Sequence, residues 1–391
     1  MDTKCGNDKS ITRLGFGCMR FPRSDEAAEE LVVAAAAAGI TYFDTAIIYP
    51  GSEAKLGRAV NKHGLREQLQ IATKIPPYLC KKPGDFDKHF EGSLTRLQTD
   101  YIDDYLVHMI SDVKVWERMK RLGIIEWAQA QKEAGRIRNF GFSFHGGFEE
   151  FKKVVDAYDW DFCLIQYNYL DKNAAGQASD DGLHYAASKG LRVNIMGPLK
   201  GGRLADSLPK AALQAFARPS SNGEVYTPEA WALRWLFNQP EVSVVLSGMK
   251  TMDVLRANIE TAKESYPGML AESDHEIIAD ARRAITDVMK VACTGCNYCM
   301  PCPQGVDIPT CLIAYNNIGV EGRIGALKNY INHTSLKEQP TVASRCNQCG
   351  RCESKCPQHI AIRTELGRVK RSFEGFYYRP IVWIARRILK V

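Results

Sequence analysis

Four polar residues in the first part of the chain have the side chains needed to reduce a carbonyl group. They are Asp44, Tyr49, Lys74 and His108, which lie at or just after the ends of three successive apolar runs. A hydride delivered to a C=O group leaves an alkoxide, and Tyr49 could supply the proton that the alkoxide takes up. The pKa of a tyrosine is normally about 10, and a nearby ammonium such as Lys74 would lower it. Asp44 could hold that ammonium, and a neutral His108 could orient the carbonyl oxygen.

Each of these four residues also has an ordinary structural explanation when it is taken alone. An aspartate can cap a helix, a lysine is usually solvated, and a histidine in YLVHMI can belong to the core. Their joint placement at three successive predicted strand ends is what indicates a reaction centre.

Two runs of four cysteines near the other end of the chain have the spacing of iron–sulfur ligands. They are Cys293, Cys296, Cys299 and Cys302, then Pro303, and Cys346, Cys349, Cys352 and Cys356, then Pro357. In the bacterial ferredoxin run C-x2-C-x2-C-x3-C-P, three cysteines bind one cluster and the fourth binds the other. The second run matches this pattern, whereas the first has a spacer of two residues before its last cysteine. Zinc is the alternative for C-x2-C motifs, but this spacing favours two [4Fe–4S] clusters.

The crossing pattern predicts which cysteines share a cluster. One set would be Cys293, Cys296, Cys299 and Cys356, and the other Cys346, Cys349, Cys352 and Cys302. The short spacer leaves the place of Cys302 open, and the role of the nearby Cys311 is undetermined, although packing is expected. The remaining cysteines, Cys5, Cys18, Cys80 and Cys163, are expected to be buried structural residues.

Composition indicates a soluble globular protein with more than one domain. A chain of 391 residues exceeds the size of one core. No apolar run approaches the roughly 18 residues of a membrane span, no secretory leader is visible, and thirteen cysteines suit a reducing, cytoplasmic location. Residues 286–391 hold 15 Lys and Arg against 7 Asp and Glu. We attribute this excess to compensation of anionic clusters and expect no nucleic-acid partner.

Strands and helices alternate regularly before the cysteine runs. Eight apolar runs predict strands at 14–18, 40–45, 69–74, 101–107, 137–143, 162–166, 191–196 and 242–247. Helical patterns lie at 25–38, 52–63, 84–98, 114–134, 147–157, 179–189, 228–238 and 251–263, and two more at 309–317 and 321–331. Eight such units predict a (β/α)8 barrel, whose catalytic groups gather at the carboxyl ends of the strands. We expect the barrel to occupy residues 1–285, with 199–226 as a functional loop, and a small, mainly helical ferredoxin-like domain to occupy 286–391.

Several segments resemble the aldo-keto reductases. GITYFDTAIIYPGSE, ATK and DYLVH resemble the signature segments of that family, and LGFGCMR resembles its first strand. The resemblance implies that Asp44, Tyr49, Lys74 and His108 form the catalytic tetrad. It covers roughly residues 11–265 and involves no Rossmann fingerprint.

The same resemblance implies the residues that bind a nicotinamide cofactor. They are Ser143 in GFSFHGG, Gln166 in IQYNYL, Met196 and Gly197 in IMGPLKGG, and Lys250 and Asn258 in SGMKTMDVLRANI. The chain departs from the family pattern at Phe144, where an Asn is usual, at Met196, where an aromatic residue is common, and at Val254, where an Arg is usual. The missing guanidinium leaves NADP(H) or NAD(H) as the expected cofactor.

The two predicted parts of the chain carry electrons in different ways. A nicotinamide gives up two electrons as a hydride, whereas an iron–sulfur cluster carries one at a time, and a flavin, for which no motif is visible, would be needed to connect them. We therefore predict an oxidoreductase that interconverts a small-molecule carbonyl and an alcohol, and whose clusters exchange electrons with a protein partner or serve regulation. The alternative is an electron-transfer or redox-sensing protein whose barrel binds a cofactor without reducing aldehydes.

The C-terminal stretch has a helical apolar stripe beside basic residues. Ile381, Ile384 and Ile388 lie on the stripe, and Arg386 and Arg387 lie off it. At about eleven residues the helix is short for an interfacial anchor, so docking on protein is expected rather than contact with a membrane surface.

Overall fold

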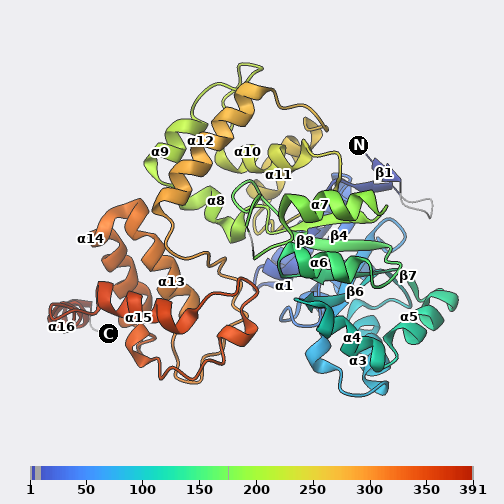
Figure 1. Cartoon of the computed structure of the whole chain (residues 1–391), viewed down its shortest axis with the longest axis horizontal. Coiled ribbons are helices and arrows are strands. Elements are labelled where there is room, and N and C mark those ends of the chain that lie inside the picture. The colour runs from blue at the N-terminus through green and yellow to red at the C-terminus, as the bar shows by residue number, and fades with distance from the viewer. Residues whose placement is uncertain (1, 5–9, 175, 390–391) are drawn as a thin grey trace. The chain divides into compact units, whose positions relative to one another are not determined.

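The computed structural model describes residues 2–4, 10–174 and 176–389, so Cys5 lies outside the described residues. The chain divides into two compact units (Figure 1). The first comprises Met1–Leu199 and Glu229–Glu272, and the second comprises Lys200–Pro228 and Ser273–Val391. The segment predicted as a barrel loop therefore belongs to the same unit as the cysteine runs.

Eight parallel strands of the first unit form a closed barrel. They are β3 (Leu14–Gly17), β4 (Tyr42–Asp44), β5 (Gln70–Ile75), β6 (Ile102–Ile110), β7 (Ile137–Phe144), β8 (Phe162–Gln166), β9 (Arg192–Met196) and β10 (Val242–Ser247). Each strand pairs with the next along the chain, and β10 closes the barrel by pairing with β3. All eight predicted strands are present, and the prediction of an eight-stranded parallel barrel is confirmed.

Helices follow the strands in the order expected of a (β/α)8 barrel (Figure 1). They are α1 (Asp25–Ala37), α2 (Ser52–Lys62), α3 (Gly84–Leu97), α4 (Val113–Arg121), α5 (Ile124–Glu133), α6 (Phe148–Val155), α7 (Ser179–Ser188), α10 (Pro228–Phe237) and α11 (Met252–Lys263). The prediction of one helix over 114–134 is wrong, because Gly123 has φ 84° and separates α4 from α5. A short antiparallel pair that was not predicted, β1 (Asp2–Lys4) and β2 (Ser10–Thr12), precedes the barrel.

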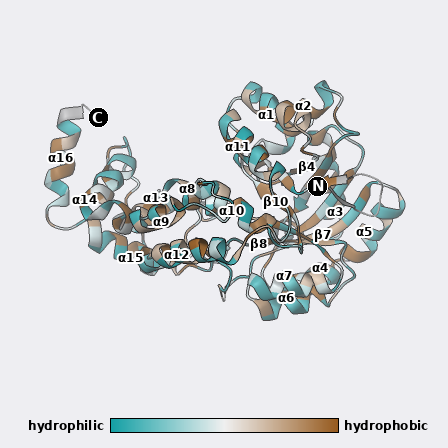
Figure 2. Ribbon diagram, turned by 90° about the horizontal axis from the view of Figure 1, so that it is seen from above, coloured by the Kyte–Doolittle hydropathy of each residue, from teal (hydrophilic) through white to brown (hydrophobic). Residues whose placement is uncertain are grey.

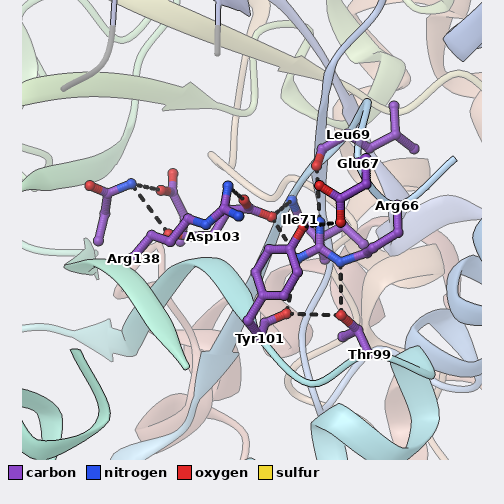
Figure 3. Close-up of polar contacts among 10 residues, drawn as sticks. Arg66, Glu67, Leu69, Ile71, Thr99, Tyr101, Asp103 and Arg138 are labelled. Carbon is purple, nitrogen blue, oxygen red and sulfur yellow. Dashed lines mark hydrogen bonds and ion pairs between the residues drawn. The ribbon is translucent and has the colours of Figure 1, made fainter. Parts of the chain in front are cut away.

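A network of charges ties together the amino-terminal ends of β5, β6 and β7 (Figure 3). The buried carboxylate of Asp103 accepts hydrogen bonds from the backbone N–H of Ile71 (2.9 Å) and from Arg138 (3.0 Å), and it pairs with Arg66 (2.8 Å). Both guanidinium groups also lie over the ring of Tyr101, at 3.7 and 4.3 Å from its centroid. Because the catalytic ends of barrel strands are the opposite ends, we assign this network to stability.

The interior of the barrel is filled by side chains from alternate positions of the strands. Its buried cluster consists of Ile11, Tyr42, Ala72, Leu106, Phe162, Leu164, Val244 and Leu246. The hydroxyl of Tyr42 donates to Asp104 (2.6 Å), which also accepts from Asn139 (2.9 Å) and from Arg192. The buried carboxylate is thus paired and fully hydrogen-bonded, as a charge in a core must be.

The second unit is mainly helical. Its helices are α8 (Arg203–Asp206), α9 (Lys210–Phe216), α12 (Glu272–Val288), α13 (Ile308–Asn316), α14 (Ile318–Tyr330), α15 (Ile362–Phe373) and α16 (Tyr378–Leu389). Short turns of helix lie at Lys200–Gly202, Ile331–Ser335, Ala343–Arg345 and Glu353–Lys355. The helices predicted at 309–317 and 321–331 are α13 and α14, whereas α8, α9 and α12 were not predicted.

Helix α9 and the residues after it are joined to α12 within this unit (Figure 1). Arg218 pairs with Asp280 at 2.8 Å, and Asp274 accepts hydrogen bonds from the backbone N–H and the hydroxyl of Ser221 (2.8 and 2.6 Å). The segment after β9 therefore has fixed partners in the second unit.

Helix α16 carries both hydrophobic and hydrophilic residues (Figure 2). Its Trp383 is 61% exposed, and Arg386 donates to the backbone carbonyl oxygens of Ser335 (2.8 Å) and Lys337 (2.7 Å). Arg386 thereby attaches the helix to the turn at Ile331–Ser335. In the part of the chain that the structure describes, no helix is long and apolar enough to cross a membrane.

Candidate active site and candidate metal centre

The four residues predicted to be catalytic lie on neighbouring strands at the carboxyl end of the barrel. Asp44 is the last residue of β4, Lys74 lies near the end of β5, and His108 lies near the end of β6. Tyr49 lies in the connection from β4 to α2, before the left-handed Gly51 (φ 70°) that precedes the helix. The parallel pairing of β4 with β5 and of β5 with β6 places these strand ends side by side.

Lys74 and Asp44 form a buried ion pair. The ammonium nitrogen of Lys74 lies 2.5 Å from Oδ1 of Asp44 and donates a second hydrogen bond to the carbonyl oxygen of Thr45 (2.7 Å). The exposed fractions of the two side chains are 0% and 7%. Burial raises the pKa of the Asp44 carboxyl, and the ammonium opposes that rise. The pair fixes one positive charge at a defined point below the barrel opening.

The rings of Tyr49 and His108 lie around this charge. The ammonium of Lys74 is 5.1 Å from the centroid of the Tyr49 ring, and the His108 ring meets Tyr49 edge-on with 6.0 Å between centroids. The cation and the imidazole thus lie beside the same aromatic ring.

The environment of His108 favours its neutral form. Burial, the charge of Lys74 and the neighbouring His145 all lower the pKa of His108 well below its usual value. His145 follows β7, is buried, and donates its backbone N–H to the carbonyl oxygen of Ile110 (2.8 Å). Sequence reasoning missed His145, although its place two residues after Ser143 at a strand end was a usable signal.

The residues predicted to hold a nicotinamide lie on the next strand ends. The hydroxyl of Ser143, at the end of β7, accepts a hydrogen bond from the backbone N–H of Met109 (2.8 Å). Met109 directly follows His108 and has φ 56°, a left-handed conformation that costs free energy in a residue with a side chain. Ser143 therefore also fixes the backbone that carries His108.

Gln166, at the end of β8, is oriented by a buried carboxylate. Its amide nitrogen donates to Asp171 (2.7 Å), which also accepts from the amide of Asn168 (3.0 Å). Asn168 donates as well to the carbonyl oxygen of Gly197 (3.1 Å), whose φ is 66°. A Cβ on Gly197 would lie 3.4 Å from the Gln166 side chain, so the glycine leaves space there. Sequence reasoning missed Asp171, five residues after Gln166.

Two residues expected to hold the adenine end of the cofactor, Asn258 and Lys250, and one expected under the nicotinamide, Met196, have different environments. Asn258 is buried and donates to the hydroxyl of Ser247 (2.8 Å) at the end of β10, so it anchors the loop that follows that strand. Lys250 is exposed in that loop, and Met196 at the end of β9 is half-buried. Arg20, which follows β3, reaches the same loop, because a Cβ on Gly248 would lie 3.4 Å from its side chain.

The cysteines of the second unit line two separate cavities. One, of about 410 Å³, is lined by Cys299, Cys302, Cys346, Cys349 and Cys352, among other residues. The other, of about 20 Å³, is lined by Cys293, Cys296, Cys299 and Cys356. The smaller cavity combines three cysteines of the first run with Cys356, and the larger one combines three cysteines of the second run with Cys299 and Cys302. Cys299 lines both cavities, and each cavity takes cysteines from both runs, as a crossed arrangement of two clusters would. All-thiolate donor sets of this kind suit iron–sulfur clusters, so the residues fit the group.

The two cysteine runs share left-handed backbone positions. Gly295 and Asn297, two and four residues after Cys293, have positive φ, and so do Gln348 and Gly350, two and four residues after Cys346. The last cysteine of each run lies six residues before a helix, α13 or α15. The two runs therefore share backbone features as well as their cysteine spacing.

Backbone N–H groups oppose the effect of burial at two of the cysteines. Burial raises the pKa of the Cys356 thiol, and the backbone N–H groups of Ile360, Gln358 and His359 lower it. That of Gly295 acts in the same way on Cys293. Burial raises the pKa of the Cys293 thiol to about 11, and a coordinating metal ion reverses that balance by removing the proton. Among the described residues, no three His, Cys, Asp or Glu side chains are close enough to hold a single ion.

Cys311 lies away from the cavity linings. It is buried in α13, in the core cluster that contains Tyr330 and Phe373, and its thiol points toward the carbonyl oxygen of Thr341 (3.8 Å). This environment indicates that the Cys311 side chain packs in the core of the second unit.

The fold and the site together define a (β/α)8-barrel protein with its polar centre at the carboxyl ends of the strands. The model of the aldo/keto reductase family matches residues 13–273, and the model of the 4Fe-4S dicluster domain matches residues 292–362. The chain belongs to the aldo/keto reductase family, is an oxidoreductase of that type, and carries a C-terminal 4Fe-4S dicluster domain. This confirms the family resemblance and the predicted fold class.

Named relatives match this chain over most of their own length. The uncharacterized oxidoreductase YrpG of Bacillus subtilis is 28% identical in an alignment 297 residues long, which covers 65% of this chain and 88% of that protein. An aldo-keto reductase of Mycobacterium sp. (strain MCS) is 30% identical over 253 residues, 64% of this chain and 81% of that protein.

Solved structures show the same fold. Aldo-keto reductase AKR11C1 from Bacillus halodurans, in its holo form, has a TM-score of 0.59 and 24% identity, covering 72% of this chain and 95% of that chain. An aldo-keto reductase from Klebsiella pneumoniae, solved in complex with NADPH, has a TM-score of 0.54 and 22% identity, covering 72% of this chain and 94% of that chain. At these identities the likeness concerns the fold.

Proposed function

We propose that the barrel interconverts a small-molecule carbonyl and the corresponding alcohol, with Tyr49 as the proton donor and NADP(H) or NAD(H) as the cofactor. The observation that carries this proposal is the buried Lys74–Asp44 pair, with Tyr49 and His108 beside it. A bound nicotinamide would supply the hydride. The hydride would add to the carbonyl carbon and the proton from Tyr49 to the carbonyl oxygen, which gives the alcohol. Solvent would then return a proton to the phenol.

The residues of the barrel then have distinct tasks. The ammonium of Lys74 stabilises the negative charge that develops on the Tyr49 oxygen as its proton leaves, and Asp44 keeps the ammonium in place. The neutral His108 can hydrogen-bond the carbonyl oxygen without competing for the proton. Ser143 and Gln166, which are held by Met109 and Asp171, are placed to orient the carboxamide of the nicotinamide.

We further propose that the C-terminal domain holds two [4Fe–4S] clusters and exchanges single electrons with a protein partner. Cys293, Cys296, Cys299 and Cys356 would hold one, and Cys302, Cys346, Cys349 and Cys352 the other. The support is the crossed lining of the two cavities and the repeated backbone conformation of the two runs. Clusters supply one-electron transfer when bound.

The proposed role of Tyr49 can be tested with one variant and one control. Tyr49→Phe should lose carbonyl reduction almost completely and keep its affinity for the nicotinamide, because only the proton donor is removed. Tyr266→Phe changes a half-exposed tyrosine elsewhere in the barrel unit and should behave as the wild type. Steady-state rates with a panel of aldehydes and ketones, and cofactor binding by fluorescence, give both readouts. Retained turnover in Tyr49→Phe would remove Tyr49 from the mechanism.

A further inference from the structure

An arginine from the segment between β9 and α10 reaches the peptide of the first ligand cysteine. Arg203 begins α8, and its Nη1 donates to the carbonyl oxygen of Cys293 (2.6 Å) and, at a longer distance, to that of Val291 (3.5 Å). Arg203 and Cys293 belong to the same compact unit. A side chain 90 residues earlier in the chain thus holds the start of the first cysteine run.

The charge of Arg203 is not neutralised by a carboxylate. The side chain is half-buried, and within the described part of the chain no Asp or Glu forms an ion pair with it. Nη1 of Arg203 lies 2.6 Å from the carbonyl oxygen of Cys293, so its charge lies beside the first residue of the cysteine run. Since water screens a half-buried charge less than an exposed one, its field at Cys293 is strong.

The other cavity has a different electrostatic environment. Arg351, Lys355 and Arg363 contribute to its lining, but all three are exposed, and Arg363 also pairs with Glu353 at 2.8 Å. Water therefore screens these charges. The two cysteine sets differ because the cation beside Cys293 is half-buried, whereas the cations that line the other cavity are exposed.

From this asymmetry we propose that Arg203 is a positioning residue that raises the reduction potential of the cluster held by Cys293, Cys296, Cys299 and Cys356. The inference rests on the proposed function, in which the domain binds two clusters. Reduction adds one electron and no proton, so the charge of the site with its four thiolates changes from about −2 to about −3. A fixed guanidinium beside Cys293 stabilises the more negative state more strongly, because Coulomb attraction grows with charge. Arg203 should therefore favour uptake of the electron.

A purely structural role is the competing explanation. Arg203 also anchors the peptide of Cys293 through its hydrogen bonds. Such an anchor would affect how well the cluster is retained, but it would not favour the reduced cluster over the oxidised one. Two variants separate charge from anchoring: Arg203→Lys keeps the charge, and Arg203→Gln keeps a hydrogen-bond donor without the charge. Arg218→Gln is the matched control, because Arg218 lies in the same segment, is exposed and pairs with Asp280.

The experiment is an anaerobic potentiometric titration of the full-length, cluster-loaded protein with dithionite, followed by electron paramagnetic resonance. Iron and sulfide are determined for each variant. Arg203→Gln should shift one of the two midpoint potentials to a more negative value, with electron affinity lowered on the order of tenfold, which is about 59 mV. Arg203→Lys should shift it less, and Arg218→Gln should leave both potentials unchanged.

The outcomes distinguish the inference from the function on which it rests. Wild-type protein with iron for fewer than two clusters would contradict the proposed function, whatever Arg203 does. Two clusters in the wild type and unchanged potentials in Arg203→Gln would overturn the role of Arg203. Loss of one cluster in both Arg203→Gln and Arg203→Lys would also overturn it, because Arg203 would then be an anchor.

Discussion

Breaking the buried ion pair between Lys74 and Asp44 should cost far more stability than replacing both partners. In Asp44→Asn, the ammonium of Lys74 stays fully buried and keeps only the carbonyl oxygen of Thr45 as a strong acceptor. Removing one partner of such a pair typically costs about 3–5 kcal/mol, because an uncompensated charge remains in the core. The double variant Asp44→Asn/Lys74→Met leaves no buried charge, and replacing both partners by neutral residues of similar size is often neutral.

The expected signature is therefore a strong coupling between the two positions. The free energy of unfolding should fall by about 3–5 kcal/mol in Asp44→Asn and by clearly less in the double variant, which gives a coupling of at least about 2 kcal/mol. Asp253→Asn breaks an exposed pair with Arg256, 3.7 Å apart, and should change stability by less than about 1 kcal/mol.

In the single variant Lys74→Met, the free energy of unfolding should depend on pH in a definite direction. Burial already raises the pKa of Asp44, and without the ammonium that rise is larger. The folded state then binds the proton more tightly than the unfolded chain, in which the pKa is about 3.9. Stability must fall as pH rises above that value, so the deficit of Lys74→Met should be smallest in acid.

Urea denaturation followed by tryptophan fluorescence measures these differences. Of the six tryptophans, Trp116, Trp127, Trp160, Trp231 and Trp235 lie in the barrel unit, so the signal reports mainly on the barrel. A double variant as unstable as Asp44→Asn, or an Asp44→Asn protein as stable as the wild type, would refute the account of a buried, coupled pair.

Two further predictions follow from the two sites. His108→Asn should flatten the loss of stability on acidification, because below about pH 6.5 the unfolded chain takes up a proton that the neutral, buried His108 does not, which costs the wild type up to about 1.4 kcal/mol per pH unit. Unfolding curves between about pH 5 and pH 7 test this, and equal slopes in both proteins would contradict it. Cys349→Ala should lower the iron content and visible absorbance of the anaerobically purified protein, whereas Cys311→Ala should keep both, since Cys311 lies in a packed core. Equal iron loss in the two variants would contradict this division of roles.

The barrel was predictable because its strands combine short apolar runs with regular spacing. The spacing of ITYFD, LQIATK and YLVH along successive units was enough to expect Asp44, Lys74 and His108 on adjacent strand ends. The local sequence pattern could not show that Gly123 ends one helix and begins another, because whether a glycine adopts a positive φ depends on packing. Helix α12 was missed because it follows the last repeat of the barrel.

The supporting residues of the site were harder to predict than the reacting ones. Asp171 and His145 act through neighbours, Gln166 and His108, and their contacts depend on how loops fold at the end of the barrel. The contact of Arg203 with Cys293 joins positions 90 residues apart, and the sequence shows the segment around Arg203 only as a long connection. In contrast, the cysteine spacing alone predicted that cysteines of both runs lie together, and both cavities are lined by cysteines of the two runs.

The division of the chain has a consequence for how such a protein could be assembled or dissected. An end-to-end fusion joins two modules by one linker, but here the backbone passes between the units at three places, near residues 199, 228 and 272. Truncation after the barrel would deprive Arg203, Arg218 and Ser221 of Cys293, Asp280 and Asp274. The cysteine-bearing region alone would likewise lack α8 and α9. The two units alternate along the chain. A transfer of the complete second unit to another protein would therefore have to include residues 200–228 as well as residues 273–391.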